Sequence, residues 1–257
     1  AAENRDYGLA MYIMDIPSYD ESTNRLFIDA AAAPNVEKTA DQLETRTIDN
    51  NYSAAYFPDV YITDPINGRR VLAPPSVAAI GAISFNDSVA YPWFAPAGFN
   101  RAALGFVENV KVRLSTADRD KLYESRINPI ATFPNGGFVI FGQKTLQLAQ
   151  SALDRVNVRR MLLEVKRQVI GVAQNLVFEQ NTPATRERFI NGVSPRLAVI
   201  QSQAGIESFR VVMDGTNNTA QDAEENRLNG TIIVVPTRAI EFVAVDFVIT
   251  NSGVSFE

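Results

Sequence analysis

The chain has 257 residues, of which 46% are hydrophobic, and its formal net charge is -5 at pH 7. This length and composition provide a core for one large or two small domains. The sequence contains neither histidine nor cysteine, which excludes disulfides, zinc sites with thiolate or imidazole ligands, and catalysis by a histidine base or a cysteine nucleophile. We therefore expect no enzymatic activity, no metal and no cofactor. The acidic balance also argues against a nucleic-acid partner.

No apolar run approaches the roughly 18 consecutive residues that cross a bilayer. The two longest candidates, residues 9–16 and 239–250, have the length of strands, and each is interrupted by acidic residues. We expect no direct insertion into a membrane. No secretory signal opens the sequence, and because the chain begins at Ala1 rather than at methionine, we expect it to be part of a longer protein.

The first third of the chain predicts alternating strands and helices. Residues 9–16 form a nearly continuous apolar run, which is typical of a strand buried on both faces of a parallel sheet. After Pro34, apolar residues recur at helical spacing and predict a helix that ends before Asp49. The next apolar segment, residues 54–63, predicts a strand that is interrupted by Pro58.

Turn residues divide the segment that follows. Residues 64–68 predict a turn before a short return strand over residues 70–72. A pair of prolines that ends at Pro75 precedes a helix of small residues, in which glycine and alanine allow close backbone approach. The stretch over residues 91–98 is rich in proline and glycine, and we predict a domain boundary there.

Beyond this boundary the alternation resumes. Residues 106–114 predict a strand, and Ser115 with Asp118 three positions later predicts the start of a short helix that ends at Ser125. Two extended pieces are predicted around the Asn135-Gly136 turn, followed by an amphipathic helix over residues 157–178. A second helix is predicted from the Thr182-Pro183 cap to Gln203, with a bend at Pro195. The remaining predicted elements are strands at 206–213, 231–235 and 240–250, and a polar acidic insert at 214–229 with a short helix.

Three segments suggest binding chemistry that we interpret more simply. The segment PNGGFVIFG, residues 134–142, is glycine-rich like a phosphate loop, but it lacks the lysine and the glycine spacing of such loops and predicts a tight turn. The acidic insert lacks the spacing of a calcium-binding EF-hand loop. Trp93 and Phe94, beside two prolines, favour packing at a domain junction over a ligand groove.

Basic residues cluster on and around the long helix. We interpret them as its solvated or interfacial face rather than as a site for a polyanion, because the chain as a whole is acidic. They are Arg155, Arg159, Arg160, Lys166 and Arg167.

Eight blocks along nearly the whole chain resemble, in order and spacing, the C-terminal half of the contractile tail sheath proteins of bacteriophages, especially T4-like and giant myophages. The blocks are AMYIMDIPS, NNYSAAYFPDVYITDP, VLAPPSVAAIGA, YPWFAPAGFNR, RINPIATFPNGGFVIFGQKTL, VNVRRMLLEVKRQVI, LVFEQN and AIEFVAVDFVIT. The chain departs from the family's pattern at SAAYFPDV, where a tyrosine-tyrosine-proline sequence is common.

The resemblance implies a fold of α/β class with two mixed-sheet domains. Residues 1–92 correspond to a peripheral domain that is incomplete at its N-terminus, and residues 93–257 to the sheath core domain that faces the tail tube. It also implies a structural subunit of the virion's tail, assembled in the bacterial cytoplasm, that polymerises around the tube and contracts to drive it through the host envelope. The implied partners are further sheath subunits, the tube protein, and baseplate and tail terminator proteins.

Two contacts are expected within this frame. The short acidic helix in the insert is expected to meet the tube through Asp222, Glu224 and Glu225. The C-terminal stretch keeps an extended, partly alternating pattern, and a strand that includes Asn251, Val254 and Phe256 is expected to add to a neighbouring subunit's sheet. An ordinary last strand with a frayed end is the alternative.

Two other functions stay open at the level of sequence. The chain fits the sheath of a related injection device, such as an R-type bacteriocin or a type VI secretion system. An α/β hydrolase built on carboxylates is a weaker alternative, because carboxylate pairs survive the absence of histidine and cysteine but nothing in the sequence marks one.

Overall fold

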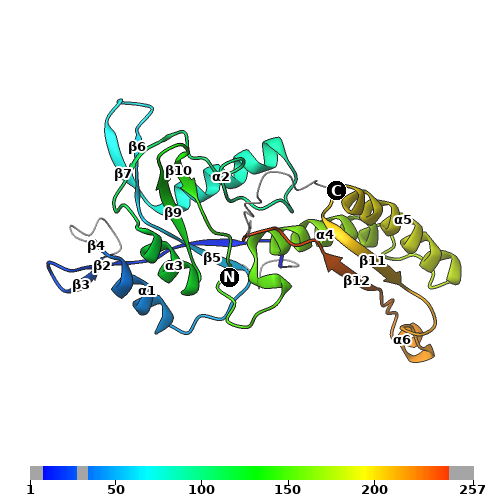
Figure 1. Ribbon diagram of the computed structural model, residues 1–257. Helices are drawn as coiled ribbons and strands as arrows, with labels where there is room; N and C mark the ends of the chain where they lie inside the picture. The colour runs from blue at the N-terminus through cyan, green and yellow to red at the C-terminus, as the bar shows by residue number, and fades with distance from the viewer. Residues whose placement is uncertain (1–7, 28–33, 243–257) are drawn as a thin grey trace, which may run out of the picture.

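The computed structural model describes residues 8–27 and 34–242, which form two regions of different construction (Figure 1). The sheet region, residues 8–146, holds most of the strands. The hairpin region, residues 152–236, holds two long helices and a two-stranded sheet. The chain combines helices with several sheets, which confirms the predicted α/β class.

The sheet region is organised around a four-stranded sheet of order β1-β5-β9-β10. β1 (Tyr12–Asp15) and β9 (Ile127–Phe133) both pair in parallel with β5 (Ser53–Phe57), and β10 (Gly137–Ile140) returns antiparallel to β9. Successive side chains of β5 point to opposite faces of the sheet. Both faces are buried, so this sheet has two cores.

Helices cover the two faces. α2 (Pro75–Val89) packs its alanines against the face of Ala54 and Tyr56, while α1 (Val36–Glu44) and α3 (Thr116–Glu124) cover the face of Ala55 and Phe57 (Figure 1). The side chains of Asn35 and Ser115 accept hydrogen bonds from the first turns of α1 and α3. These caps satisfy donors that the helices themselves leave unpaired.

Two smaller sheets complete this region. After the break at Pro58, β6 (Val60–Thr63) lies between β7 (Arg70–Ala73) and β8 (Val107–Val110) in an antiparallel sheet. The sequence did not indicate the other sheet, in which β2 (Ser18–Asp20) pairs with β3 (Arg25–Phe27) and β4 (Pro34–Asn35).

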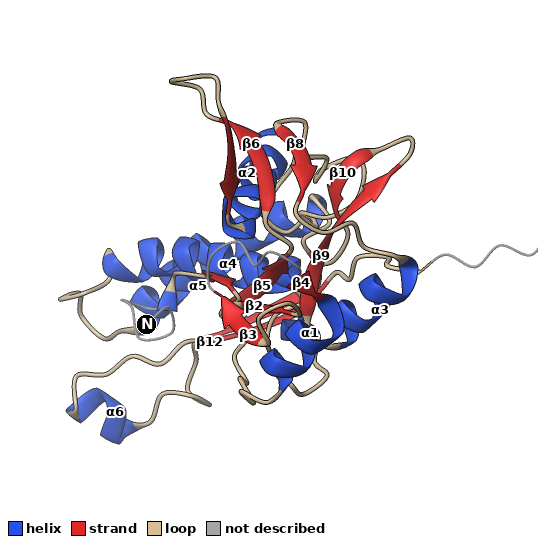
Figure 2. Cartoon of the chain, turned by 90° about the vertical axis from the view of Figure 1, so that its left-hand side faces the viewer, coloured by secondary structure: helices blue, strands red, loops and turns tan. Residues whose placement is uncertain are grey.

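The hairpin region begins with a 3-10 helix, η2 (Ala152–Asp154), followed by the helical pair α4 (Val156–Gln174) and α5 (Pro183–Ser202). The ribbon, our name for β11 (Ile206–Val212) paired antiparallel with β12 (Thr231–Pro236), packs on these helices. Between its strands lies α6 (Ala220–Glu224), which stands away from the body in both views (Figures 1 and 2). α5 continues through Pro195.

Two findings depart from the sequence-based expectations. β1 lies at the edge of its sheet and Tyr12 is 54% exposed, so the apolar run at residues 9–16 is not buried on both faces. The central sheet also combines β1 and β5 with β9 and β10, and therefore crosses the predicted boundary at residues 92 and 93.

Among the residues that the structure describes, none of the helices combines the length and the apolar character needed to span a bilayer.

Candidate assembly surfaces

The ribbon is the most incomplete part of the fold. β11 and β12 pair only with each other, so each has one edge without a strand partner among the described residues. On its outward face Ile233 and Val235 are 52% and 44% exposed, and they lie across from Arg210 and Ser208. Open edges with apolar neighbours are templates for pairing with another chain.

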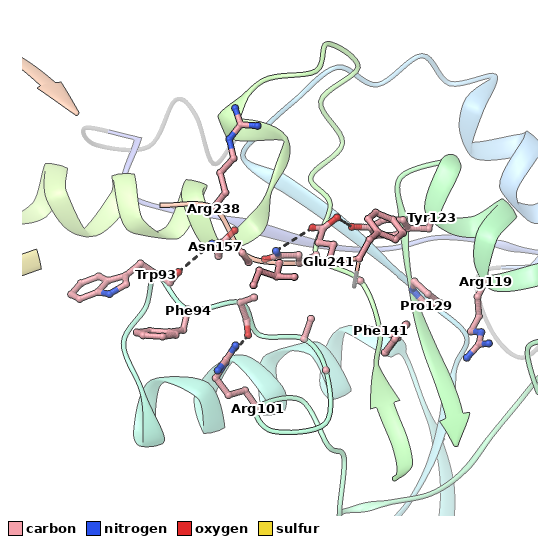
Figure 3. A pocket seen from close by; sticks show the side chains of 18 of the residues that line it. Trp93, Phe94, Arg101, Arg119, Tyr123, Pro129, Phe141, Asn157, Arg238 and Glu241 are labelled. Atoms are coloured by element: carbon pink, nitrogen blue, oxygen red, sulfur yellow. Dashed lines mark hydrogen bonds between the residues drawn. The ribbon is translucent and has the colours of Figure 1, made fainter. Parts of the chain in front are cut away.

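After β12 the chain returns to the sheet region and is held there by Glu241 (Figure 3). The Glu241 carboxylate accepts hydrogen bonds from Arg155 at 2.6 and 3.1 Å, from the hydroxyl of Tyr123 at 2.8 Å and from the amide of Gln143 at 3.2 Å. Arg155 also pairs with Asp154 at 3.1 Å. This cluster joins the exit of the ribbon, our name for the segment over residues 237–242 that follows β12, to both regions.

Burial shifts the pKa values of two side chains near Glu241. Burial, and then the negative charge of Glu241, raise the pKa of Tyr123 well above its ordinary value, so its hydroxyl stays protonated and donates. Burial, and then the positive charge of Arg155, lower the pKa of nearby Lys144, whose ammonium donates to the Tyr123 carbonyl at 2.7 Å. Sequence reasoning noted Arg155 but missed Glu241, because 86 residues separate them.

The expected inter-subunit strand lies outside the described residues. Asn251, Val254 and Phe256 all follow residue 242, the last that the structure describes. The structure does show that the chain is held at Glu241, shortly before that segment begins.

The interpretation of the basic cluster as a solvated or interfacial face is wrong for two of its members. Arg159 is 3% exposed; its guanidinium bonds Asn51 and lies 4.0 Å from the centre of the Tyr52 ring. Arg160 donates to the carbonyl of Pro92 and pairs with a carboxylate of α2. The partners of both arginines belong to the sheet region, so these arginines attach α4 to that region.

The acidic insert spans residues 214–229 and contains the predicted short helix as α6. Asp222 accepts from the backbone and hydroxyl of Thr219, a cap that lowers the pKa of Asp222. Glu225 pairs with Arg227 at 3.1 Å, and Glu224 is exposed. The structure thus brings the three expected tube-contact residues together on one projection, with the Asp222 carboxylate already engaged in the cap.

The glycine-rich segment and the Trp93-Phe94 segment both have structural roles in the fold. The glycine-rich segment forms the turn between β9 and β10, with Gly137 at a φ of +63°, which confirms the predicted turn. A Cβ on Gly136 would lie 2.5 Å from the Phe99 ring. Trp93 is 7% exposed and packs in the core of the hairpin region, as predicted, but Trp93 and Phe94 also line a groove.

The chain is similar to curated proteins that are named tail sheath proteins. It is 35% identical over 226 residues to that of Vibrio phage KVP40 and 31% identical over 210 residues to that of Enterobacteria phage T4. These matches cover 86% and 82% of this chain but 33% and 32% of the relatives. The chain therefore spans about a third of the length of the curated relatives it matches.

Solved structures share the fold. A sheath complex of PVC, an extracellular contractile injection system, in its contracted state matches with a TM-score of 0.72 at 24% identity, over 82% of this chain and 60% of that one. The baseplate of the anti-feeding prophage in its contracted state matches with a TM-score of 0.75 at 20% identity, over 93% of this chain and 65% of that one.

A match to a protein-family model shows which residues of the chain carry the similarity. Residues 149–250 match the model described as the phage tail sheath C-terminal domain, a range that contains the whole hairpin region. The chain is thus a relative of the bacteriophage tail sheath proteins and carries their C-terminal domain.

Proposed function

We propose that this chain is the C-terminal part of a subunit of a bacteriophage contractile tail sheath. The subunit polymerises around the tail tube and contracts to drive the tube through the host envelope. The observation that carries the proposal is the 35% identity to a phage tail sheath protein across 86% of this chain. The role is structural rather than enzymatic, and its place is the virion, after assembly in the host cytoplasm.

The open edges of the ribbon support the proposal that the subunit polymerises. A contact between two different surfaces that does not close into a ring generates a helical array. Strands added to the open edges of β11 and β12 would link subunits while the sheet region moves as a rigid body. A strand containing Asn251, Val254 and Phe256 of a neighbouring subunit is the proposed addition.

The acidic insert supports a contact with the tube. Asp222, Glu224 and Glu225 lie on a projection that an oppositely charged patch can reach, and such pairing weakens as salt rises. Reversing Glu224 and Glu225 to lysine would impair assembly on tubes and leave folding intact, since neither carboxylate caps the helix. Normal assembly of that variant would place the contact elsewhere.

Domain roles and further partners follow from the same proposal. Residues 93–257 are proposed to lie near the tube and residues 1–92 more peripherally, with the central sheet shared between the two parts. The baseplate and the tail terminator are proposed to lie at the two ends of the array. A phage is favoured over a related injection device because the curated relatives above 30% identity are phage proteins.

Electron microscopy of the longer protein expressed alone tests the proposal. We expect tubes from a protein of the relatives' full length and monomers from this chain in sedimentation at micromolar concentration. A longer protein that stays monomeric at high concentration, and that cannot assemble on purified tail tubes, would contradict the proposal.

A further inference from the structure

A groove of about 660 Å³ opens where the two regions meet (Figure 3). Trp93 and Phe94 lie on one side and Phe141 on the other, with Glu241 between them and Tyr123 on the side of Phe141. The groove therefore combines an aromatic lining with the polar cluster that holds the exit of the ribbon.

Two buried amide oxygens in the lining have no hydrogen-bond partner among the described residues. They are Oε1 of Gln143, which is 3% exposed, and Oδ1 of Asn157, which is 4% exposed. The amide nitrogen of Gln143 donates to Glu241 and that of Asn157 donates to the Trp93 carbonyl. Because the nitrogens are engaged with acceptors, the free atoms are the oxygens, which need donors.

The rim of the groove is cationic. Arg101, Arg119 and Arg238 reach it from three different segments, and none of them pairs with a carboxylate of the described residues. The carboxylates in the lining are Asp120 and Glu241, and Glu241 is already paired with Arg155. Asp120 has no ion pair among the described residues either, so three arginines face one carboxylate and the net unpaired charge around the groove is positive.

We propose that this groove binds an extended acidic segment of a partner protein, in which acidic residues alternate with aromatic or branched aliphatic residues. Backbone N–H groups of such a segment donate to Gln143 and Asn157. Successive side chains of an extended chain point to opposite sides, so the apolar ones meet the aromatic lining while the acidic ones meet the arginines. The proposal does not depend on the sheath assignment, because it rests on this groove alone.

Trp93 makes binding directly measurable, since it is the only tryptophan in the sequence and lines the groove. The probe is a capped hexapeptide, Asp-Phe-Glu-Val-Asp-Leu, titrated into the intact chain while its intrinsic fluorescence is recorded. The control peptide is Lys-Phe-Lys-Val-Lys-Leu. We expect saturable binding of the acidic peptide and an affinity for the basic one that is lower by roughly ten-fold or more.

A charge-reversed variant, Arg119→Glu with Arg238→Glu, should lose the acidic peptide and gain the basic one. Arg101 is left in place because its Nε donates to the carbonyl of Ala95 at 3.1 Å. The matched control is Arg196→Glu, since Arg196 is exposed on α5 away from the groove lining. Circular dichroism melts check that each variant folds.

A modified probe tests the amide oxygens without changing the protein. The same acidic peptide with N-methyl groups at Glu and Val lacks two central N–H donors, and we expect it to bind about five-fold more weakly or worse. Equal binding of the methylated and unmethylated peptides would remove the role given to Gln143 and Asn157.

Four results would overturn the proposal. They are no binding of the acidic peptide, equal binding of the basic one, binding only after residues 243–257 are deleted, and self-association of the chain that the charge-reversed variant abolishes. The third result would assign the groove to the chain's own C-terminal segment, and the fourth to a second copy.

Discussion

The central sheet and the ribbon are both small sheets packed on helices, but only the central sheet has inner strands that pair on both sides. β5 has strands on both sides and helices over both faces, and Ala54, Ala55, Tyr56 and Phe57 are all buried. The ribbon has helices on one face, exposed Ile233 and Val235 on the other, and no strand beyond either edge among the described residues. Inner strands such as β5 stabilise their own chain, whereas a sheet that consists only of edge strands provides a place for another chain.

The largest expected effect comes from truncating one residue in each sheet. Ile130 is fully buried in the central sheet, so Ile130→Ala should lower the free energy of unfolding by about 3 kcal/mol through lost burial and a cavity. Ile233→Ala on the ribbon should lower it by less than about 1 kcal/mol. Urea unfolding of the isolated chain measures both, and equal losses would mean that the ribbon belongs to a closed core.

The join between the two regions gives the next effect. Glu241→Gln removes the charge that Arg155 pairs with in a partly buried cluster, and should cost about 2 kcal/mol. Glu179→Gln is the matched control, because its pair with Arg188 is exposed and should contribute less than about 0.5 kcal/mol. If both variants unfold at the same urea concentration, the cluster does not hold the ribbon's exit.

The pH dependence of stability tests the same join. The pKa of Tyr123 is raised in the folded chain above its ordinary value of 10.0. The unfolded chain therefore releases this proton above about pH 10 while the folded chain keeps it, so stability falls as pH rises. Between about pH 9 and about pH 11 the parent should lose about 1.4 kcal/mol more than Tyr123→Phe. Parallel stability curves would contradict the partly buried position of this hydroxyl.

Helix caps give the smallest effect and contrast a packed helix with a projecting one. Ser115→Ala removes the cap of α3, which packs on the central sheet, and should cost about 1 kcal/mol of global stability. Thr219→Ala removes the equivalent cap of α6, which stands away from the body, and should leave the unfolding midpoint almost unchanged. Thermal melts of the two variants decide, and a larger loss for Thr219→Ala would mean that the insert is integral to the fold.

Patterns of a few neighbouring residues predicted the elements that depend mainly on local interactions. The spacing of Val36, Ala40 and Leu43 predicted α1, and Ser115 with Asp118 predicted the capped start of α3. Pro58 divided a long apolar segment into β5 and β6, as expected.

Features that depend on distant partners could not be predicted. Arg159 has the sequence context of a solvated helix face, but its partner Asn51 lies 108 residues earlier and brings it into the interior. Glu241, Gln143 and Asn157 carry no motif, and only the fold brings them to one groove. β2, β3 and β4 are too short to produce a period. The proposed function came from resemblance rather than from local chemistry.

Hydrogen exchange tests most directly whether the ribbon is completed by another subunit. In the isolated chain, amides of β11 and β12 should exchange faster than those of β5 and β9, because half of the ribbon's backbone groups face open edges. In assembled tubes of the longer protein, exchange in the ribbon should slow while exchange in β5 and β9 stays the same. Exchange in the ribbon that is as slow as in the central sheet before assembly, or that does not change on assembly, would contradict the account.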